Sequence, residues 1–407
     1  MKEMIQEHPK LRPLMVFPIS QPDGGAAICL RDPEGFSDAA LMINHATYLM
    51  MTLMDGTRDV SGIQADFMRQ TQVMIPREQI VDLIGKLHQY LFLDGEGFRL
   101  HRKRIEEDFL HASVRPAAHS GTAYPQTAEE LSGFLTGFFS ALKESAHPDG
   151  TVSGIIAPHM DIREAGSCYA SAYARLKGSA ASTMIILGTA HGSIGENRYS
   201  ICPKDFETPL GVIPCDQEGI EQIHDAAGVD WTQGQLGHRI EHSVEFQAVF
   251  LRYLFPEREI KIIPVLCNSF ADLMDRPEGP MYDDSIRLFV ETLKAFLARR
   301  NGKAALIAGA DLSHVGPKFG DSMPLTETDL VSLKTHDLSL IRHVEEGDAE
   351  GFFKEIQKER ESHNVCGLPN IYTFLKIMEG GKGRLLDYGQ FFEPPTSSAV
   401  SYASLVF

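Results

Sequence analysis

The spacing of hydrophobic residues changes near residue 114 of the chain. Before this point, apolar side chains recur three and four positions apart, as they do in amphipathic helices. After it, short aliphatic runs alternate with helical stretches, which is typical of an α/β domain with a mainly parallel central sheet and flanking helices. We therefore expect two domains, 1–104 and 114–407, joined by a charged linker over 105–113.

The first domain is predicted to be a small winged-helix-like α+β unit. Its pattern predicts two strands, at 13–18 and 25–31, and three helices, at 38–56, 59–72 and 77–93. The stretch LDGEGFRLHRKR (93–104) has the turn chemistry of a short hairpin, which would close the helices.

The second domain alternates strands and helices. Strands are predicted at 151–158, 183–190, 260–267, 304–310 and 384–390. Helices are predicted at 127–145, 164–177, 216–226, 242–254, 283–299, 327–345 and 368–379. In open sheets of this kind ligands bind outside the carboxyl ends of the strands, so a functional site is expected there.

Composition and charge exclude several classes of protein. With 407 residues, 43% of them hydrophobic and 23% charged, the chain has enough apolar material for a buried core. A net charge of −17 argues against nucleic acid as a partner, because no basic surplus is present to neutralise phosphates. No apolar run approaches the length of about 18–20 residues that a membrane span needs. The N-terminal stretch MKEMIQEHPKLRP lacks the apolar core of a signal peptide, and we expect a cytoplasmic location.

Three predicted strands end in residues suited to metal binding. His159 and Asp161 end the first of these strands, in GIIAPHMDI. His191 ends the second, in MIILGTAHG, and Asp311 and His314 follow the third, in ALIAGADLSHVG. A single histidine at a strand end is commonly a hydrogen-bonded core residue, but three such ends in one chain favour a shared site. Two neutral imidazoles suit iron, copper, zinc or nickel.

The residues alone leave the third ligand open. The candidates are Cys366 in SHNVCGLPN, His363 beside it, and the pair Glu241 and His242 in RIEHSVEFQ. Structural roles compete with these functions. Glu241 stands at a predicted helix start, where a carboxylate complements the helix dipole, and Ser313 in DLSH is typical of a helix N-cap.

The second domain resembles the Memo family, protein B of the AmmeMemoRadiSam set. The family's motifs follow in order as VRPAAHSGTAYP, APHMDI, GTAHG, EHSVEFQ, IIPVL, GADLSH, CG and SSAVSYAS. The resemblance implies the fold of class III extradiol ring-cleaving dioxygenase subunits, with non-haem iron(II) as the ancestral metal. It also implies three metal ligands, namely His159, His191 and Cys366. The candidate catalytic residues are Asp311 beside the metal, His314 as the acid/base imidazole, and His242.

The chemistry of this residue set is coherent. Two imidazoles and one anionic ligand leave open positions on iron(II), the geometry used for oxygen activation. A thiolate in place of a carboxylate softens the site, so copper and zinc are alternatives to iron. His314 is expected to titrate near neutrality and to move a proton to or from a bound substrate. Asp161 is expected either to orient a metal ligand or to anchor the start of the following helix, and the second role is preferred.

The first domain resembles the PqqD-like peptide-binding family at LMDGTRDVSGI (53–63). The resemblance implies that it holds a peptide or docks a partner by strand addition, plausibly alongside a radical-SAM enzyme. Three functions follow for the whole chain. The preferred one is an iron-dependent oxygenase or oxidase acting on a small aromatic or peptide-borne group. The others are a non-catalytic copper- or iron-binding scaffold, and a zinc-dependent hydrolase with His314 or Glu241 as general base.

Overall fold

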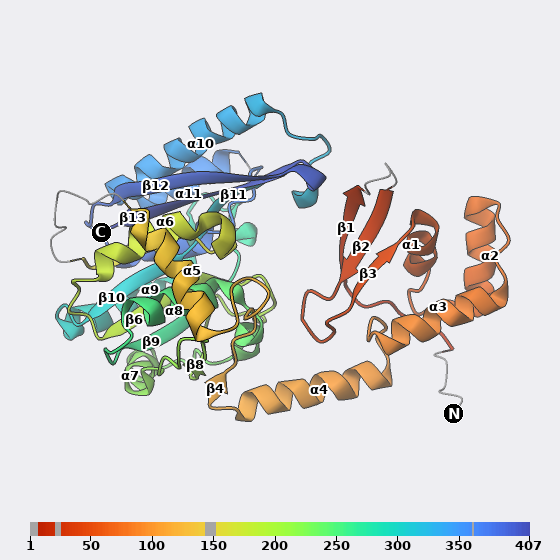
Figure 1. Ribbon diagram of the computed structural model, residues 1–407, viewed down its shortest axis with the longest axis horizontal. Helices are drawn as coiled ribbons and strands as arrows, with labels where there is room; N and C mark the ends of the chain where they lie inside the picture. The colour runs from red at the N-terminus through yellow and green to blue at the C-terminus, as the bar shows by residue number, and fades with distance from the viewer. Residues whose placement is uncertain (1–6, 21–25, 143–151, 360–361) are drawn as a thin grey trace. The chain divides into compact units, whose positions relative to one another are not determined.

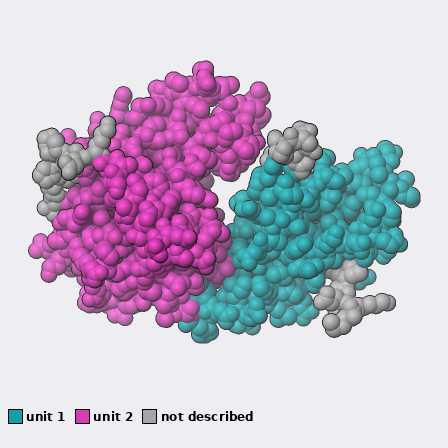
Figure 2. Space-filling model, in the orientation of Figure 1, with its two compact units in different colours: residues 1–111 teal, residues 112–407 magenta. Residues whose placement is uncertain are grey.

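The computed structural model describes residues 7–20, 26–142, 152–359 and 362–407. The chain divides into two compact units, residues 1–111 and 112–407, which are coloured teal and magenta in Figure 2. Among the described helices, none is both long enough and apolar enough to span a bilayer.

Unit 1 has a three-stranded antiparallel sheet followed by helices (Figure 1). Its strands, in sheet order, are β1 (Met15–Ser20), β2 (Ala26–Arg31) and β3 (Ala40–Ile43). Its helices are α1 (His45–Thr52), α2 (Val60–Thr71), α3 (Arg77–Gln89) and α4 (Glu96–His111). The two strands predicted before residue 32 are confirmed over their described residues, residue 25 lying outside these. The helices predicted at 59–72 and 77–93 are also confirmed.

Two predictions for unit 1 are wrong. The helix expected over 38–56 begins only at His45, because the side chain of Asn44 accepts a hydrogen bond from the Thr47 N–H and so caps the helix there. The residues before it form β3, in which exposure alternates. The hairpin expected over 93–104, which defined the winged-helix type, is absent, because residues 96–104 form the first part of α4. Charges four positions apart support this helix, as in the Arg102–Glu106 pair at 2.6 Å.

Unit 2 is built around a mixed sheet whose centre is parallel. Within the described residues the strand order is β11-β13-β5-β10-β6-β9-β7, and β12 pairs with β13. The parallel strands are β5 (Gly154–Ala157), β10 (Ala304–Gly309), β6 (Thr183–Thr189) and β9 (Lys261–Cys267). Antiparallel strands flank them: β7 (Tyr199–Ile201), β11 (Asp311–Val315), β12 (Arg384–Glu393) and β13 (Ser398–Val406). A separate parallel pair joins β4 (Val114–Arg115) to β8 (Asp205–Phe206).

Helices cover both faces of this sheet (Figure 1). One group packs together against β5, β6 and β13: α5 (Ala128–Ser140), α6 (Ile162–Leu176) and α8 (His242–Leu254). A second group includes α7 (Gln217–Ala227), α9 (Asp284–Arg300) and α12 (Leu368–Ile377). Two further helices, α10 (Glu327–Glu346) and α11 (Ala349–Lys358), pack against each other and next to α12 and the antiparallel strands.

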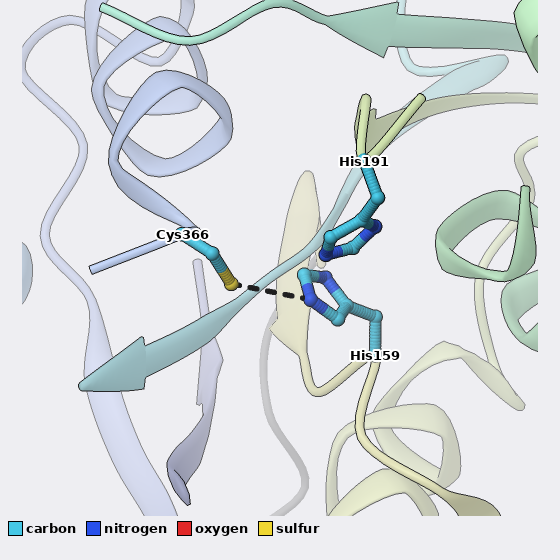
Figure 3. Close-up of side chains that lie close together, drawn as sticks. All are labelled: His159, His191 and Cys366. Atoms are coloured by element: carbon cyan, nitrogen blue, oxygen red, sulfur yellow. Dashed lines mark hydrogen bonds between the residues drawn. The ribbon is translucent and has the colours of Figure 1, made fainter. Parts of the chain in front are cut away.

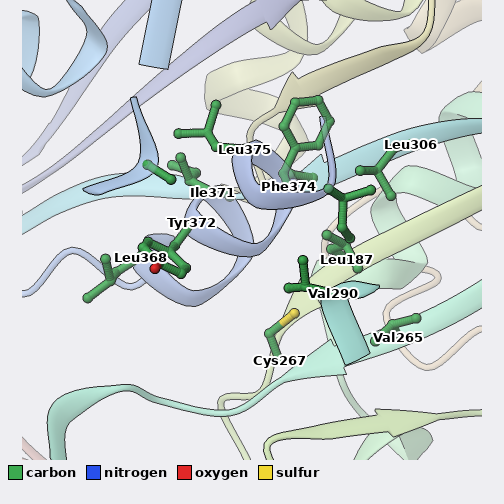
Figure 4. Packing of buried hydrophobic residues seen from close by; sticks show 14 of the residues in the cluster. Leu187, Val265, Cys267, Val290, Leu306, Leu368, Ile371, Tyr372, Phe374 and Leu375 are labelled. Carbon is green, nitrogen blue, oxygen red and sulfur yellow. The ribbon is translucent and has the colours of Figure 1, made fainter. Parts of the chain in front are cut away.

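The core lies where the central strands meet α12. Every residue of β6 is buried, as expected for a parallel strand covered on both faces. Figure 4 shows Leu187 and Leu306 of the sheet beside Ile371 and Leu375 of α12. This packing fixes the carboxyl ends of β5, β10 and β6 next to the start of α12.

The α/β fold class is confirmed, and so are the strands and helices predicted for unit 2 over their described residues. Residue 151 of one predicted strand and residues 143–145 of one predicted helix lie outside the described residues. The sequence did not indicate β11, β13 or α11. Ser313 lies in β11 and donates to Asp337 Oδ1 at 2.6 Å, so its expected N-cap role is wrong.

Candidate metal centre

His159 follows β5 and its ring is fixed by main-chain contacts. Its Nδ1 lies 2.9 Å from the carbonyl oxygen of Gly309, which directs the Nδ1–H to that acceptor and leaves Nε2 with a lone pair. Its main-chain N–H donates to Asp311 Oδ1 at 2.9 Å. The side chain is 2% exposed, and this burial lowers the pKa of His159. A neutral imidazole, the form that binds metals, is therefore present at neutral pH.

His191 follows β6 and is held by the buried carboxylate of Glu241. Oε2 of Glu241 accepts the main-chain N–H of His191 at 2.9 Å, and Oε1 lies 3.0 Å from its Nδ1. Oε1 also accepts the Ser243 N–H, which makes Glu241 the N-cap of α8. Burial acts to lower the pKa of His191, but the Glu241 carboxylate outweighs it and raises this pKa. The ring is thus oriented through Nδ1, with Nε2 free to bind.

Cys366 lies two positions before α12, and its sulfur is beside the His159 ring (Figure 3). Sγ is 3.3 Å from Nε2 of His159. The next residue explains this approach: the Gly367 N–H donates to the Asp311 carbonyl at 3.2 Å, and a Cβ on Gly367 would stand 2.3 Å from the same oxygen. Only glycine lets the segment lie so close to β11. Burial raises the pKa of the Cys366 thiol well above its usual value.

His159, His191 and Cys366 therefore form one group. A ligand atom from each lies within 4.8 Å of the other two, and the two rings stand 5.0 Å apart at 89°. Both imidazoles have one nitrogen occupied by a protein acceptor and the other available, the usual arrangement of metal-binding histidines. Two imidazoles and a thiol that can ionise suit a transition-metal ion.

Asp311 and His314 share β11 but have different surroundings. Oδ1 of Asp311 accepts the N–H groups of His159 and Met160, and its Oδ2 lies 3.5 Å from His159 Nε2. The His314 ring packs edge-on against Phe319, with its Nδ1 3.2 Å from the Leu312 carbonyl. Burial lowers the pKa of His314 to about 4. The expectation that it titrates near neutrality is therefore wrong, because the desolvated ring resists protonation.

The remaining candidates for the third ligand are placed differently. His242 stacks on His191 with centroids 4.7 Å apart, and its Nδ1 is 3.3 Å from Glu241. Glu241 also forms a possible ligand group with these two histidines, but both of its oxygens already accept N–H donors. His363 turns to another group, where its Nδ1 lies 2.8 Å from Glu359.

Comparison with known proteins identifies the family. The family model described as Memo-like protein matches residues 115–406, which is nearly all of unit 2. The chain belongs to the Memo family. A MEMO1 family protein of Aquifex aeolicus is 32% identical over 400 residues, covering 98% of this chain and all of the relative. Relatives from Thermus thermophilus and Thermococcus kodakarensis are 27% and 30% identical, over 87% and 72% of this chain and 100% and 99% of their own.

The Memo resemblance noted in the sequence is thus confirmed, whereas the PqqD-like character of unit 1 stays a prediction. The match to the Aquifex protein extends through unit 1, so this relative has the same overall extent. Asp161 of this Memo protein caps α6 by accepting the Arg163 N–H at 2.9 Å, as expected.

One residue beside the His159–His191–Cys366 group was not identified from the sequence. Asn370 is fully buried, and its Nδ2 donates to the Gly309 carbonyl at 2.7 Å and to Thr189 Oγ1 at 3.0 Å. It thereby ties the ends of β10 and β6 to the first turn of α12, near Cys366. The available signal was a polar residue four positions after Cys366, at the start of an otherwise apolar helix of the Memo domain.

Proposed function

We propose that the chain is an iron-dependent oxygenase or oxidase whose metal is held by His159, His191 and Cys366. The observation that carries the proposal is the 3.3 Å separation of Cys366 Sγ, in the turn before α12, from Nε2 of His159, just after β5. Iron(II) bound by two imidazoles and one anion supplies open coordination positions for oxygen chemistry. Family membership supports the proposal, because all three residues lie within residues 115–406, the part of the chain that the family model matches.

The surrounding residues prepare this site. The Gly309 carbonyl and the Glu241 carboxylate fix the two rings, so that each directs Nε2 to the centre. The Cys366 thiol is protonated on its own and gives up its proton only when a cation stabilises the thiolate. Asp311 holds the chain at His159 by accepting two main-chain N–H groups.

His314 is proposed as the base that accepts a proton from a substrate hydroxyl. Its Nδ1 lies 3.2 Å from the Leu312 carbonyl, which leaves Nε2 to accept the proton. Because its pKa is about 4, the ring is neutral around pH 7 and accepts a hydrogen bond from the hydroxyl, but it is a weak base there and takes up the proton only from a strongly acidified hydroxyl. His242, stacked on His191, is proposed to limit the space around that ring and to exclude water from it.

A cavity beside these residues supports a small aromatic or peptide-borne substrate. Its volume is about 400 Å³, and Met160 and Phe319, which adjoin His159 and His314, line it. Phe391 adds a second aromatic wall. The charged residues of the lining are of both signs and largely paired, Arg163 with Asp161 and Lys318 with Glu393. A ring of a substrate would pack between the aromatic walls, with its polar groups toward the histidines.

Unit 1 is proposed to present a peptide or a partner protein such as a radical-SAM enzyme. The support is β3, which lies at the edge of its three-stranded sheet with alternately exposed side chains, including Met42 at 51% exposed. An edge strand of this kind offers free main-chain groups for strand addition.

Anaerobic reconstitution with iron(II) tests the proposal. The loaded protein is expected to give a nitric-oxide EPR signal and to consume oxygen with the correct substrate class. His159→Ala should abolish the signal, whereas His343→Ala, which changes a partly buried residue of α10 outside the group, should leave it intact. A loaded protein without a nitrosyl signal, or a signal unchanged by His159→Ala, contradicts an iron centre at this group.

The sulfur ligand also favours a second candidate, a copper- or iron-binding module without turnover. A thiolate binds soft ions such as copper(I) tightly. In that case the metal content of protein isolated anaerobically would be copper or iron in full occupancy, with no oxygen consumed. Zinc in full occupancy would instead favour hydrolysis with His314 as the base, since both oxygens of Glu241 are engaged.

A further inference from the structure

Two imidazoles share one carboxylate oxygen at the end of α11. Oε2 of Glu359 lies 3.2 Å from Nδ1 of His336 and 2.8 Å from Nδ1 of His363. The two rings stack with centroids 3.9 Å apart and planes 11° apart. A ligand atom from each of the three residues lies within 4.8 Å of the other two. The donors of three separate segments thus converge on one point.

The group lies in a shallow position that an ion can reach. His336 projects from α10, Glu359 follows α11 directly, and His363 lies in the segment that leads to α12. Their side chains are 10%, 36% and 28% exposed. Nε2 of His336 is buried and has no hydrogen-bond partner among the described residues, whereas its Nδ1 faces Glu359 and its ring stacks on His363.

Charge favours a cation at this point over a simple ion pair. Two stacked imidazoles 3.9 Å apart cannot both be protonated without strong repulsion. Burial first, and then His363, lower the pKa of His336. Glu359, Asp337 and Glu355 all place negative charge near that ring. Glu355 is itself paired with Lys358 at 2.7 Å, so the Glu359 carboxylate supplies the negative charge at the point where the two Nδ1 atoms meet.

We propose that His336, Glu359 and His363 form a second metal site, separate from the His159–His191–Cys366 group, which takes a divalent transition-metal ion such as zinc. Two imidazoles and one carboxylate are a ligand set that zinc uses, at distances of about 2.0–2.2 Å. Calcium and magnesium prefer ligand sets made of oxygen alone. Three protein ligands leave the remaining positions to water, so the ion would exchange with the solvent.

The second site would brace the segment that carries Cys366. The His363 carbonyl accepts the His314 N–H at 2.7 Å, and Asn364 Nδ2 donates to the His314 carbonyl at 3.2 Å. Cys366 follows three residues after His363. An ion bound to His363 would therefore fasten this segment to α10 and α11, in addition to its existing contact with β11.

Zinc binding by the full chain tests the site when the first group is removed. In a His159→Ala, Cys366→Ala background, titration against a chromophoric chelator is expected to find one equivalent of bound zinc. The further change Glu359→Gln, which keeps the size of the side chain, should remove that equivalent. Cobalt(II) should give a visible absorption band in the background protein, and the band should disappear in the Glu359→Gln and His363→Ala proteins.

His343→Ala is the matched control. It lies on the same helix, and its Nδ1 is 3.1 Å from Asp348, but no second imidazole joins that pair. The control should retain the zinc equivalent and the cobalt band. A background protein that binds no zinc overturns the proposal, and so does a loss of zinc in His343→Ala equal to that in Glu359→Gln. Should Glu359→Gln fail to fold by circular dichroism, the result with His363→Ala decides the question.

Discussion

Sγ of Cys366 lies 3.3 Å from Nε2 of His159, although 207 positions separate the two residues in the chain. The fold brings them together through three independent features. β5 delivers His159 at its carboxyl end, Asp311 holds the following N–H groups, and Gly367 lets the Cys366 segment approach β11. A sulfur and a neutral imidazole placed in this way are preorganised for a shared cation.

Replacing Cys366 by alanine should remove metal binding at this group. The substitution deletes the one ligand that becomes anionic, and two neutral imidazoles alone hold a divalent cation weakly. Chelator competition with iron(II) or zinc should show the loss of one equivalent. Cys168→Ala, which changes a buried cysteine of α6, is the control and should bind metal as the parent does. Equal binding by both variants would show that Cys366 is not a ligand.

Gly367→Ala should weaken metal binding without changing any ligand. The added methyl group would stand 2.3 Å from the Asp311 carbonyl, so the Cys366 segment must move away from β11. The matched control is Gly192→Ala beside His191, where nothing lies within 4 Å of the new carbon. Metal titration of both variants, together with their thermal melting, measures the effect. If Gly192→Ala weakens binding as much, steric displacement of Cys366 is not the cause.

Glu241→Gln should lower metal affinity by about 10- to 100-fold, the usual cost of losing a residue that orients a ligand. The amide keeps the shape and one acceptor, but it cannot accept both N–H groups of His191 and that of Ser243 as the carboxylate does. Competition titration gives the affinity. Glu218→Gln, on the surface helix α7, should have no effect. An unchanged affinity in Glu241→Gln would mean that His191 needs no such support.

The sequence predicts the centre of the fold well because burial and periodicity coincide there. A short, fully buried aliphatic run such as β6, bounded by polar and glycine-containing segments, is typical of a parallel strand that is covered on both faces. The same signal is absent from β11, whose residues Asp311, Ser313 and His314 are polar although mostly buried, and which is paired only through distant β13. The turn-forming residues of 93–104 also led to the wrong prediction of a hairpin. Charges four positions apart stabilise α4 in this segment instead.

The candidate ligands could be named from the sequence only in part. Strand ends point to His159 and His191, because parallel strands align their carboxyl ends. Neither spacing nor composition shows whether Cys366 or His363, three positions earlier, is the third metal ligand. That assignment depends on the family resemblance. Their different surroundings, one beside β5 and the other beside α10, arise from the packing of distant helices.

Unit 2 should lose stability as the pH falls from about 6.5 to about 4. Burial lowers the pKa of His238 to about 4, whereas an exposed imidazole has a pKa of about 6.5. In this range the unfolded chain binds a proton that the folded chain refuses, so acid favours unfolding. The difference is worth about 3 kcal/mol for such a group at the acid end. Urea unfolding at several pH values should show the decline.

His238→Gln isolates this contribution, because the amide does not titrate. The variant should be less stable at pH 7, since it loses the fitted ring, but its stability should fall less steeply between pH 6.5 and 4. His343→Gln at the surface should keep the parent slope. A parent-like slope in His238→Gln would assign the acid sensitivity to other buried groups, His314 being the next to change.

Glu245→Ala should destabilise unit 2 by about 3–5 kcal/mol, the cost of leaving a buried charge without its partner. Glu245 and Arg115 form an ion pair in which both side chains are fully buried. The Tyr124 hydroxyl and the N–H groups of Ala118 and His119 also donate to this carboxylate. Its removal therefore leaves four donors, these three and the Arg115 guanidinium, without this acceptor. The pair fastens the start of unit 2 to α8, the helix that Glu241 begins.

A surface pair gives the contrast for this prediction. Glu379 pairs with Lys294, but its side chain is 66% exposed, and Glu379→Ala should cost less than about 1 kcal/mol. Urea unfolding followed by far-UV circular dichroism compares the two variants at the same pH. Because α8 supports both Glu241 and His242, the destabilised Glu245→Ala protein should also bind metal less tightly, and Glu379→Ala should not. Similar small losses in the two variants would mean that the buried network is dispensable for the fold.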